Sequence, residues 1–96
     1  MTASLSTHVL DTAAGRPAAG VRVELRRAGT EVAAAQTDGD GRARLADDLE
    51  PGAYSLVFHP PSAFFRRVEL ELDLLEGHYH VPLLVSPYGC VTYRGS

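Results

Sequence analysis

The sequence predicts an all-β protein, an antiparallel β-sandwich of about eight short strands. Apolar and polar residues alternate with a period of two over much of the chain, as they do in strands that bury one face. Gly, Pro and Asp interrupt these runs at intervals of roughly ten residues, a spacing typical of sandwiches. No long stretch has helical periodicity, and no linker or internal repeat divides the chain. We therefore expect one sandwich domain, residues 1–96.

The first half of the chain contains four expected strands. They lie at residues 5–10, 21–26, 31–37 and 42–45. Turn residues separate them: Gly15 and Pro17 follow the first strand and Gly29 follows the second. Before the fourth strand, Asp38 to Gly41 makes a tight connection, because its glycines accept a positive φ.

The second half contains four more expected strands. They lie at residues 54–59, 67–74, 78–85 and 89–95. Pro60 and Pro61 stop the first of these, since proline cannot donate to a strand ladder. His59, ahead of both prolines, is expected to be a solvated strand end. Gly77 turns the chain into the His78 strand, and Ser86 to Gly89 forms the last turn.

Composition excludes several classes of function. The net charge of −3 and the pI near 5.7 disfavour nucleic acid as a partner. All nine basic residues are arginine, which excludes a lysine Schiff base. Cys90 is the one cysteine, so no intrachain disulfide forms, and its apolar neighbours indicate a packed thiol. No apolar run approaches the ~18–20 residues of a membrane span and the start does not resemble a signal peptide, so we expect a cytoplasmic protein.

The most unusual stretch is the last nineteen residues, His78 to Ser96. On a strand, His78 and His80 share one face while Tyr79 lies on the other. A globular domain rarely needs two imidazoles side by side on a strand. The stretch therefore predicts a polar site near the C-terminus.

Two stretches resemble the signatures of the transthyretin-related 5-hydroxyisourate hydrolases. STHVLDT (Ser6 to Thr12) is similar to their N-terminal signature, and HYHVPLL, SPYG and YRGS are similar to their C-terminal one. The resemblance implies a transthyretin-like, or prealbumin-like, sandwich that forms a homotetramer as a dimer of dimers. It also implies an enzyme of urate degradation without cofactor or metal. That enzyme converts 5-hydroxyisourate to 2-oxo-4-hydroxy-4-carboxy-5-ureidoimidazoline by water attack on a cyclic amide.

The resemblance implies catalytic roles for four residues, His8, Arg42, His80 and Ser96. His8 and His80 suit proton transfer and water activation, because the unperturbed pKa of imidazole is about 6.5. The guanidinium of Arg42 would hold the substrate oxygens by paired donors, with Arg44 as the fallback. The hydroxyl or terminal carboxylate of Ser96 would complete the hydrogen bonds. Which histidine is the base stays open.

Three further residues accompany this set. Tyr93 is expected to bind substrate together with Arg42 and Ser96. His78 is expected to support the site by orienting its neighbour, and Arg94 by seating the C-terminal tail.

Three alternatives stay open at this point. A zinc site could use His8, His78 and His80, because two histidines flanking one residue on a strand is a workable spacing. Residues 15–58 also resemble the carboxypeptidase-regulatory or collagen-adhesin-type modules, in which such segments carry no chemistry. A carrier like transthyretin is the third possibility, although polar groups at His8, His80 and Tyr93 suit a small polar heterocycle better than a hormone.

The chain departs from the family in two places. Between Phe58 and Val68 only residues 59–67 remain where the family has a longer stretch with a short helix, so we expect that helix to be shortened or missing. Cys90 stands where a tyrosine is more usual. The shortened stretch bears on the packing over one sheet and on the stability of the dimer.

Overall fold

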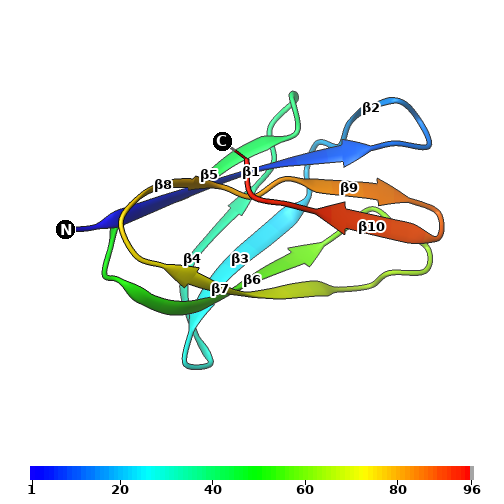
Figure 1. The fold of residues 1–96 in the computed structure, drawn as a ribbon. Helices are drawn as coiled ribbons and strands as arrows, with labels where there is room; N and C mark the ends of the chain where they lie inside the picture. The colour runs from blue at the N-terminus through cyan, green and yellow to red at the C-terminus, as the bar shows by residue number, and fades with distance from the viewer. Residues whose placement is uncertain (96) are drawn as a thin grey trace.

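The computed structural model describes residues 1–95, which form two β-sheets packed face to face (Figure 1). The strands are β1 (Ala3–Asp11), β2 (Arg16–Pro17), β3 (Arg22–Arg27), β4 (Thr30–Gln36), β5 (Arg42–Leu49), β6 (Gly52–His59), β7 (Val68–Leu74), β8 (Gly77–His80), β9 (Leu83–Ser86) and β10 (Gly89–Thr92). The all-β sandwich is confirmed. Within residues 1–95 there is no helix, so the connecting helix is missing, as expected. Among these residues, no helix has the length and apolarity to cross a membrane.

Strand β1 is the centre of the first sheet. That sheet runs in the order β10-β9-β1-β2, and β5 and β8 also pair with β1. The second sheet runs β4-β3-β6-β7. The pairings are antiparallel except those of β1 with β8 and β9, which are parallel. One strand therefore brings the start of the chain beside both its middle and its end.

The strand count differs from the expected eight because one strand is split and one is added. On β1, Ser6 is paired with His80 of β8 and Val9 with Leu83 of β9, so both strands continue the same parallel register along β1. The pairing is interrupted at Pro82, which has no N–H to donate to the ladder. The added strand, β2, is a two-residue pairing inside the stretch expected to be a turn.

The core lies between the inner faces of the two sheets. Leu5, Val9 and Leu83 from the first sheet pack with Leu56 and Phe58 from the second, and all five are fully buried. Truncating a buried aromatic such as Phe58 typically costs about 3–5 kcal/mol. Alternate residues of β1 point inward, so its remaining side chains are left for the outer face of the first sheet.

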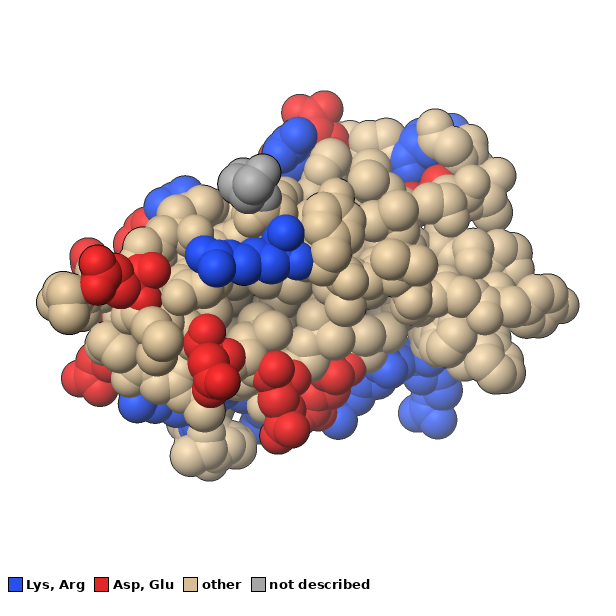
Figure 2. Space-filling model, in the orientation of Figure 1, with Lys and Arg blue, Asp and Glu red and all other residues tan. Residues whose placement is uncertain are grey.

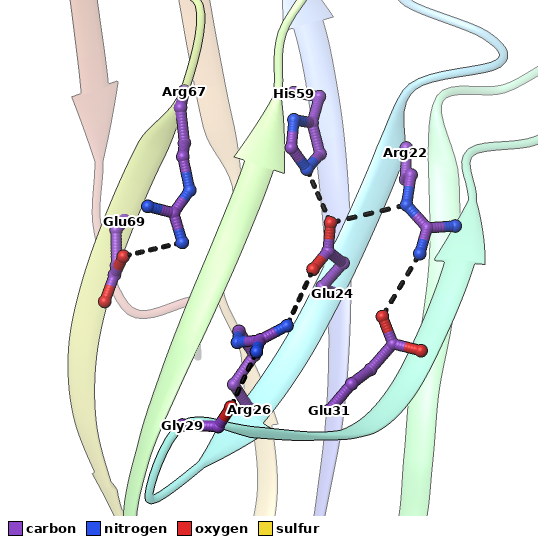
Figure 3. A network of polar contacts seen from close by, with 8 residues as sticks. All are labelled: Arg22, Glu24, Arg26, Gly29, Glu31, His59, Arg67 and Glu69. Carbon is purple, nitrogen blue, oxygen red and sulfur yellow. Dashed lines mark hydrogen bonds and ion pairs between the residues drawn. The ribbon is translucent and has the colours of Figure 1, made fainter.

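The outer face of the second sheet carries a charged network centred on Glu24 (Figure 3). Its carboxylate accepts hydrogen bonds from side-chain nitrogens of His59 at 2.6 Å, Arg26 at 3.2 Å and Arg22 at 3.3 Å. The hydrogen bond from His59 is the main reason that the pKa of Glu24 lies below its usual value. His59 is thus not merely a solvated strand end, because it closes this network from the last position of β6.

The shortened stretch between β6 and β7 lies beside the turn between β9 and β10. Phe64 contacts Phe65 edge to face at 4.9 Å between ring centroids, and the Tyr88 ring lies 6.5 Å from Phe64. Cys90, at the start of β10, is half-buried against the core, and burial raises the pKa of its thiol. A raised pKa disfavours the thiolate, in keeping with a packed thiol.

Two edge strands run along the same side of the sandwich. β7 ends the second sheet and β10 ends the first. The exposed positions of β7 are acidic, Glu69, Glu71 and Asp73. Figure 2 shows acidic side chains gathered along the side of the molecule where β7 lies. Charged residues at an edge oppose indiscriminate strand pairing.

Candidate active site

Three neighbouring strands of the first sheet carry three of the four expected catalytic residues, His8, Arg42 and His80. β1 lies between β5 and β8. His8 is directly opposite Arg42 of β5, and Ser6 is opposite both Arg44 of β5 and His80 of β8. Strand pairing alone therefore gathers segments that are far apart in the sequence.

A hollow of about 470 Å³ lies over these strands. Its polar lining consists of Ser6, Thr7, Asp38, Arg42, Arg44, His78 and His80. His8 does not line it but sits at its margin, because its cross-strand neighbour is Arg42. The structure thus brings Arg42 and His80 to one hollow, with His8 next to it.

The turn from Asp38 to Gly41 sets the positions of His8 and Arg42. The Asp38 carboxylate accepts the backbone N–H of Asp40 at 2.9 Å and that of Arg42 at 3.0 Å, and these bonds lower its pKa. Gly41 has φ +76°, and a Cβ there would come within 2.5 Å of the Val9 carbonyl oxygen. Only glycine fits, so the turn can press against β1.

This turn also fixes the ring of His8. The Asp40 carbonyl oxygen lies 2.8 Å from His8 Nε2. A carbonyl only accepts hydrogen bonds, so Nε2 carries a proton and donates it there. In the neutral ring, Nδ1 is then the nitrogen with an open lone pair.

The two arginines of β5 differ in what they contact. The Arg44 guanidinium donates to Asp47 Oδ1, with Nε at 3.0 Å. Within the described part of the chain, no carboxylate lies at ion-pair distance from Arg42. Arg42 is therefore the guanidinium that is available to an anionic ligand, and Arg44 is committed to its own strand.

His80 is the half-buried imidazole of the hollow. Its Nδ1 is hydrogen-bonded to Ser6 Oγ at 2.8 Å, which leaves Nε2 for a ligand. Burial lowers the pKa of His80 below its usual value, and the positive charges of Arg42, His8 and His78 lower it further. A neutral imidazole near a guanidinium can accept a proton from a bound water.

His78 is exposed and holds both of its ring nitrogens against serine hydroxyls. Nδ1 lies 2.7 Å from Ser4 Oγ, and Nε2 lies 2.9 Å from Ser6 Oγ. The supporting role expected for His78 stays a prediction, and these contacts are the ones through which His78 would act. Ser4 and Ser6 were not among the expected site residues. Their signal is the period of two, which puts both on the face of β1 that carries His8.

The C-terminal tail is tied to β8. The Arg94 guanidinium lies 4.3 Å from the centroid of the Tyr79 ring, and the Gly95 N–H donates to the His80 carbonyl oxygen at 2.6 Å. This cation–π contact is the one by which Arg94 would seat the tail, the role expected for it. A Cβ on Gly95 would lie 2.8 Å from His80 Cδ2, so the tail presses against the ring of His80.

Tyr93, one of the expected substrate contacts, lies away from this hollow. Tyr93 lines a different hollow of about 640 Å³, formed with β7 and with Tyr79, and neither His8, Arg42 nor His80 lines that hollow. Ser96 lies outside the described residues.

The three histidines are not arranged as a metal site. Among residues 1–95, no three His, Cys, Asp or Glu side chains are grouped so that they could hold an ion. Both ring nitrogens of His78 meet hydroxyl groups, so His78 has no lone pair directed at an ion shared with His80.

The comparison with known proteins agrees with the observed fold, and the matched region contains both of the terminal stretches, up to residue 95, that predicted the family. A model described as the HIUase/Transthyretin family matches residues 5–95. The chain belongs to the HIUase/Transthyretin family. The 5-hydroxyisourate hydrolase of Caulobacter vibrioides is 44% identical over 112 aligned positions, which cover 96% of this chain and 97% of that protein. Because the chain has only 96 residues, the alignment contains gaps on its side.

Solved structures of the HIUase/Transthyretin family have the same fold. The structure of Klebsiella pneumoniae 5-hydroxyisourate hydrolase superposes with a TM-score of 0.88 at 37% identity, covering 98% of this chain and 99% of that one. Sea bream transthyretin in complex with thyroxine has a TM-score of 0.83 at 27% identity, covering 95% and 93%. The solved structures that this chain resembles thus include one named as a hydrolase and one in complex with thyroxine.

Proposed function

We propose that this chain is a 5-hydroxyisourate hydrolase of urate degradation. It would convert 5-hydroxyisourate to 2-oxo-4-hydroxy-4-carboxy-5-ureidoimidazoline. The observation that carries the proposal is the hollow in which Arg42 and a neutral His80 converge, with His8 at its margin. A charged and polar lining of this kind suits a small heterocycle rich in carbonyl groups better than an apolar hormone.

The proposed mechanism gives each side chain one task. The guanidinium of Arg42 binds the carbonyl oxygens and stabilises the negative charge that develops when water attacks. His80 takes a proton from the water through Nε2, since its Nδ1 is held by Ser6. His8, fixed by its bond to the Asp40 carbonyl, lies next to Arg42 and assists proton transfer through Nδ1. We assign Ser96 a hydrogen bond to the substrate.

The test is the decay of freshly made 5-hydroxyisourate, followed spectroscopically with and without the purified chain. We expect clear acceleration that survives dialysis against a strong chelator. A family member that only carries a ligand would leave the spontaneous rate unchanged, which would refute the proposal. Activity lost to the chelator and restored by zinc would instead move the mechanism to a metal.

The assignment of Arg42 is our first prediction. Arg42→Lys keeps the charge but loses the paired donors, so kcat/KM should fall on the order of a hundredfold. Arg67→Lys is the matched control and should be near wild type, because Arg67 lies just before β7 of the opposite sheet and is paired with Glu69. In His8→Ala and in His80→Ala, kcat/KM should fall by a similar factor. Equal activity of Arg42→Lys and Arg67→Lys would remove Arg42 from the site.

A further inference from the structure

Four side chains form one continuous row of hydrogen bonds across β1 and β8. Ser4 Oγ lies 2.7 Å from His78 Nδ1, His78 Nε2 lies 2.9 Å from Ser6 Oγ, and Ser6 Oγ lies 2.8 Å from His80 Nδ1. The parallel register produces the row, because Ser4 is opposite His78 and Ser6 is opposite His80. The row leads from the exposed His78 to the half-buried His80 in the hollow.

The hydroxyl of Ser6 couples the two rings because it has only one proton. It donates that proton to one histidine and accepts from the other. When Ser6 donates to His78 Nε2, His80 Nδ1–H donates to Ser6, and the Nε2 lone pair of His80 is open as a base. When the row is reversed, Ser6 donates to His80 Nδ1, and neutral His80 carries its proton on Nε2 as an acid.

The surroundings of the row disfavour a positive charge on His80. Burial lowers the pKa of His80, and the charges of Arg42 of β5 and His8 of β1 lower it further. His78 is exposed and lies close to Asp47 of β5. The hydrogen bond from Arg44 lowers the pKa of the Asp47 carboxyl, and the charge of His78 adds to this effect. Arg94 lies against Tyr79, whose side chain is on the other face of β8.

We propose that Ser6 and His78 form a proton relay that sets the tautomer of His80 and carries its proton towards the exposed end of the row, with Ser4 holding the ring of His78 in place. His80 remains the residue that meets the substrate, and the other three are positioning residues. The inference rests on the proposed hydrolase function, and it assigns roles to two serines and one histidine beyond the set proposed above.

Over one turnover, every proton that the relay takes up is returned. As the water oxygen bonds to the carbonyl carbon, one water O–H bond breaks and His80 Nε2 takes that proton. The Nδ1 proton of His80 passes to Ser6, and the Ser6 proton passes to His78 Nε2, so the positive charge moves to His78. When the ring C–N bond breaks, His80 gives its Nε2 proton to the leaving nitrogen. The Ser6 proton then returns to His80 Nδ1 while His78 returns its proton to Ser6, and the starting state is restored.

Two variants break the row at different points. His78→Gln keeps a polar side chain but cannot hold the transferred proton, and Ser6→Ala removes the central hydroxyl. We expect kcat to fall on the order of tenfold to a hundredfold in each. KM should change little, because Arg42 still binds the substrate. Ser6→Thr restores the hydroxyl and should recover most of the rate. His59→Gln, on the opposite sheet, is the matched control for the histidine change and should keep the wild-type rate.

Two readouts separate a relay from a merely structural role. In mixtures of light and heavy water, the kcat of the wild type should depend on the deuterium fraction along a curve, since several protons move together. For Ser6→Ala this dependence should be linear. Nitrogen-15 NMR of the His80 ring in the full chain reports its tautomer without any substrate. We expect the ratio of the two His80 tautomers to change in both His78→Gln and Ser6→Ala.

The outcomes are distinguishable. If wild-type chain leaves the decay of 5-hydroxyisourate unchanged, the hydrolase function fails, while the NMR readout still decides whether the two rings are coupled. If the wild type is active but His78→Gln has the same kcat and the same ratio of His80 tautomers as the wild type, the relay is refuted. Should Ser6→Ala fail to fold, His78→Gln and Ser6→Thr carry the test. Lower thermal stability with an unchanged kcat would also refute the relay.

Discussion

At His80, burial and the nearby positive charges act in the same direction, because each disfavours the imidazolium. The pKa of His80 is therefore below its usual value of 6.5, and the base form persists at lower pH than in a free imidazole. We predict that the acid limb of kcat/KM lies below pH 6.5. Arg42→Gln should raise the pKa of His80, because it removes one of the charges. An NMR titration of the His80 ring measures this even in inactive protein, and a wild-type midpoint at or above 6.5 would contradict it.

Gly95 matters because of the space that it leaves for His80. A methyl group at Gly95 would meet Cδ2 of that ring at 2.8 Å, so the ring or the tail must move. We predict that Gly95→Ala lowers kcat/KM by roughly tenfold or more, since small displacements of catalytic groups are costly. Gly39→Ala is the control, because a Cβ there meets nothing within 4 Å. Equal rates for the two variants would show that the tail does not position His80.

At the scale of the strand, alternation predicted most of the fold but not the partners of each strand. The runs around Leu5, Val23 and Leu56 are strands whose apolar residues are buried, as the period of two requires. The split at Pro82 follows from its missing N–H, a signal that the sequence contains. Two-residue β2 has no periodicity and could not be predicted.

The candidate site was predictable as a set of residue types but not as a geometry. His78 and His80 share a face, as their spacing predicted, because both contact Ser6. The contact of His78 with Ser4 depends on the parallel register of β1 with β8, and a single sequence does not reveal which strands are neighbours. The position of Tyr93 in another hollow likewise depends on where the tail crosses β8.

The network on β3 predicts how stability responds to acid. The folded-state pKa of Glu24 is below its ordinary value of 4.5, so its stabilising effect is complete above that pH and is lost as pH falls through the lower folded value. We predict that Glu24→Gln lowers the thermal midpoint by a few degrees near pH 7. Below the folded pKa, the midpoints of variant and wild type should converge. A difference that stays constant from pH 7 to pH 3 would contradict this origin of the stabilisation.

For the whole molecule, the side between β7 and β10 is the least complete. Strands β7 and β10 are both edges, and the hollow of about 640 Å³ between them contains Leu70 and Leu72. Val91 and Tyr93 at this side are more than half exposed. Unpaired edges together with exposed apolar side chains are the features of a surface that can pair with another protein chain. A second copy can pair edge to edge, whereas β4 at the far edge has a single large exposed apolar side chain, Val32, among the described residues.

We therefore expect a homotetramer, in which pairs of chains join along the β7 and β10 edges and two such dimers meet over the hollow that contains Arg42 and His80. Four copies of a 10.3-kDa chain weigh about 41 kDa, which light scattering distinguishes from a monomer. Val91→Arg places a charge in the proposed edge contact and should shift the mass downward and reduce activity. Val32→Arg, at the opposite edge, should leave both unchanged. A wild-type chain that is fully active at the monomer mass would refute the assembly, because its hollow would then be sufficient without a partner.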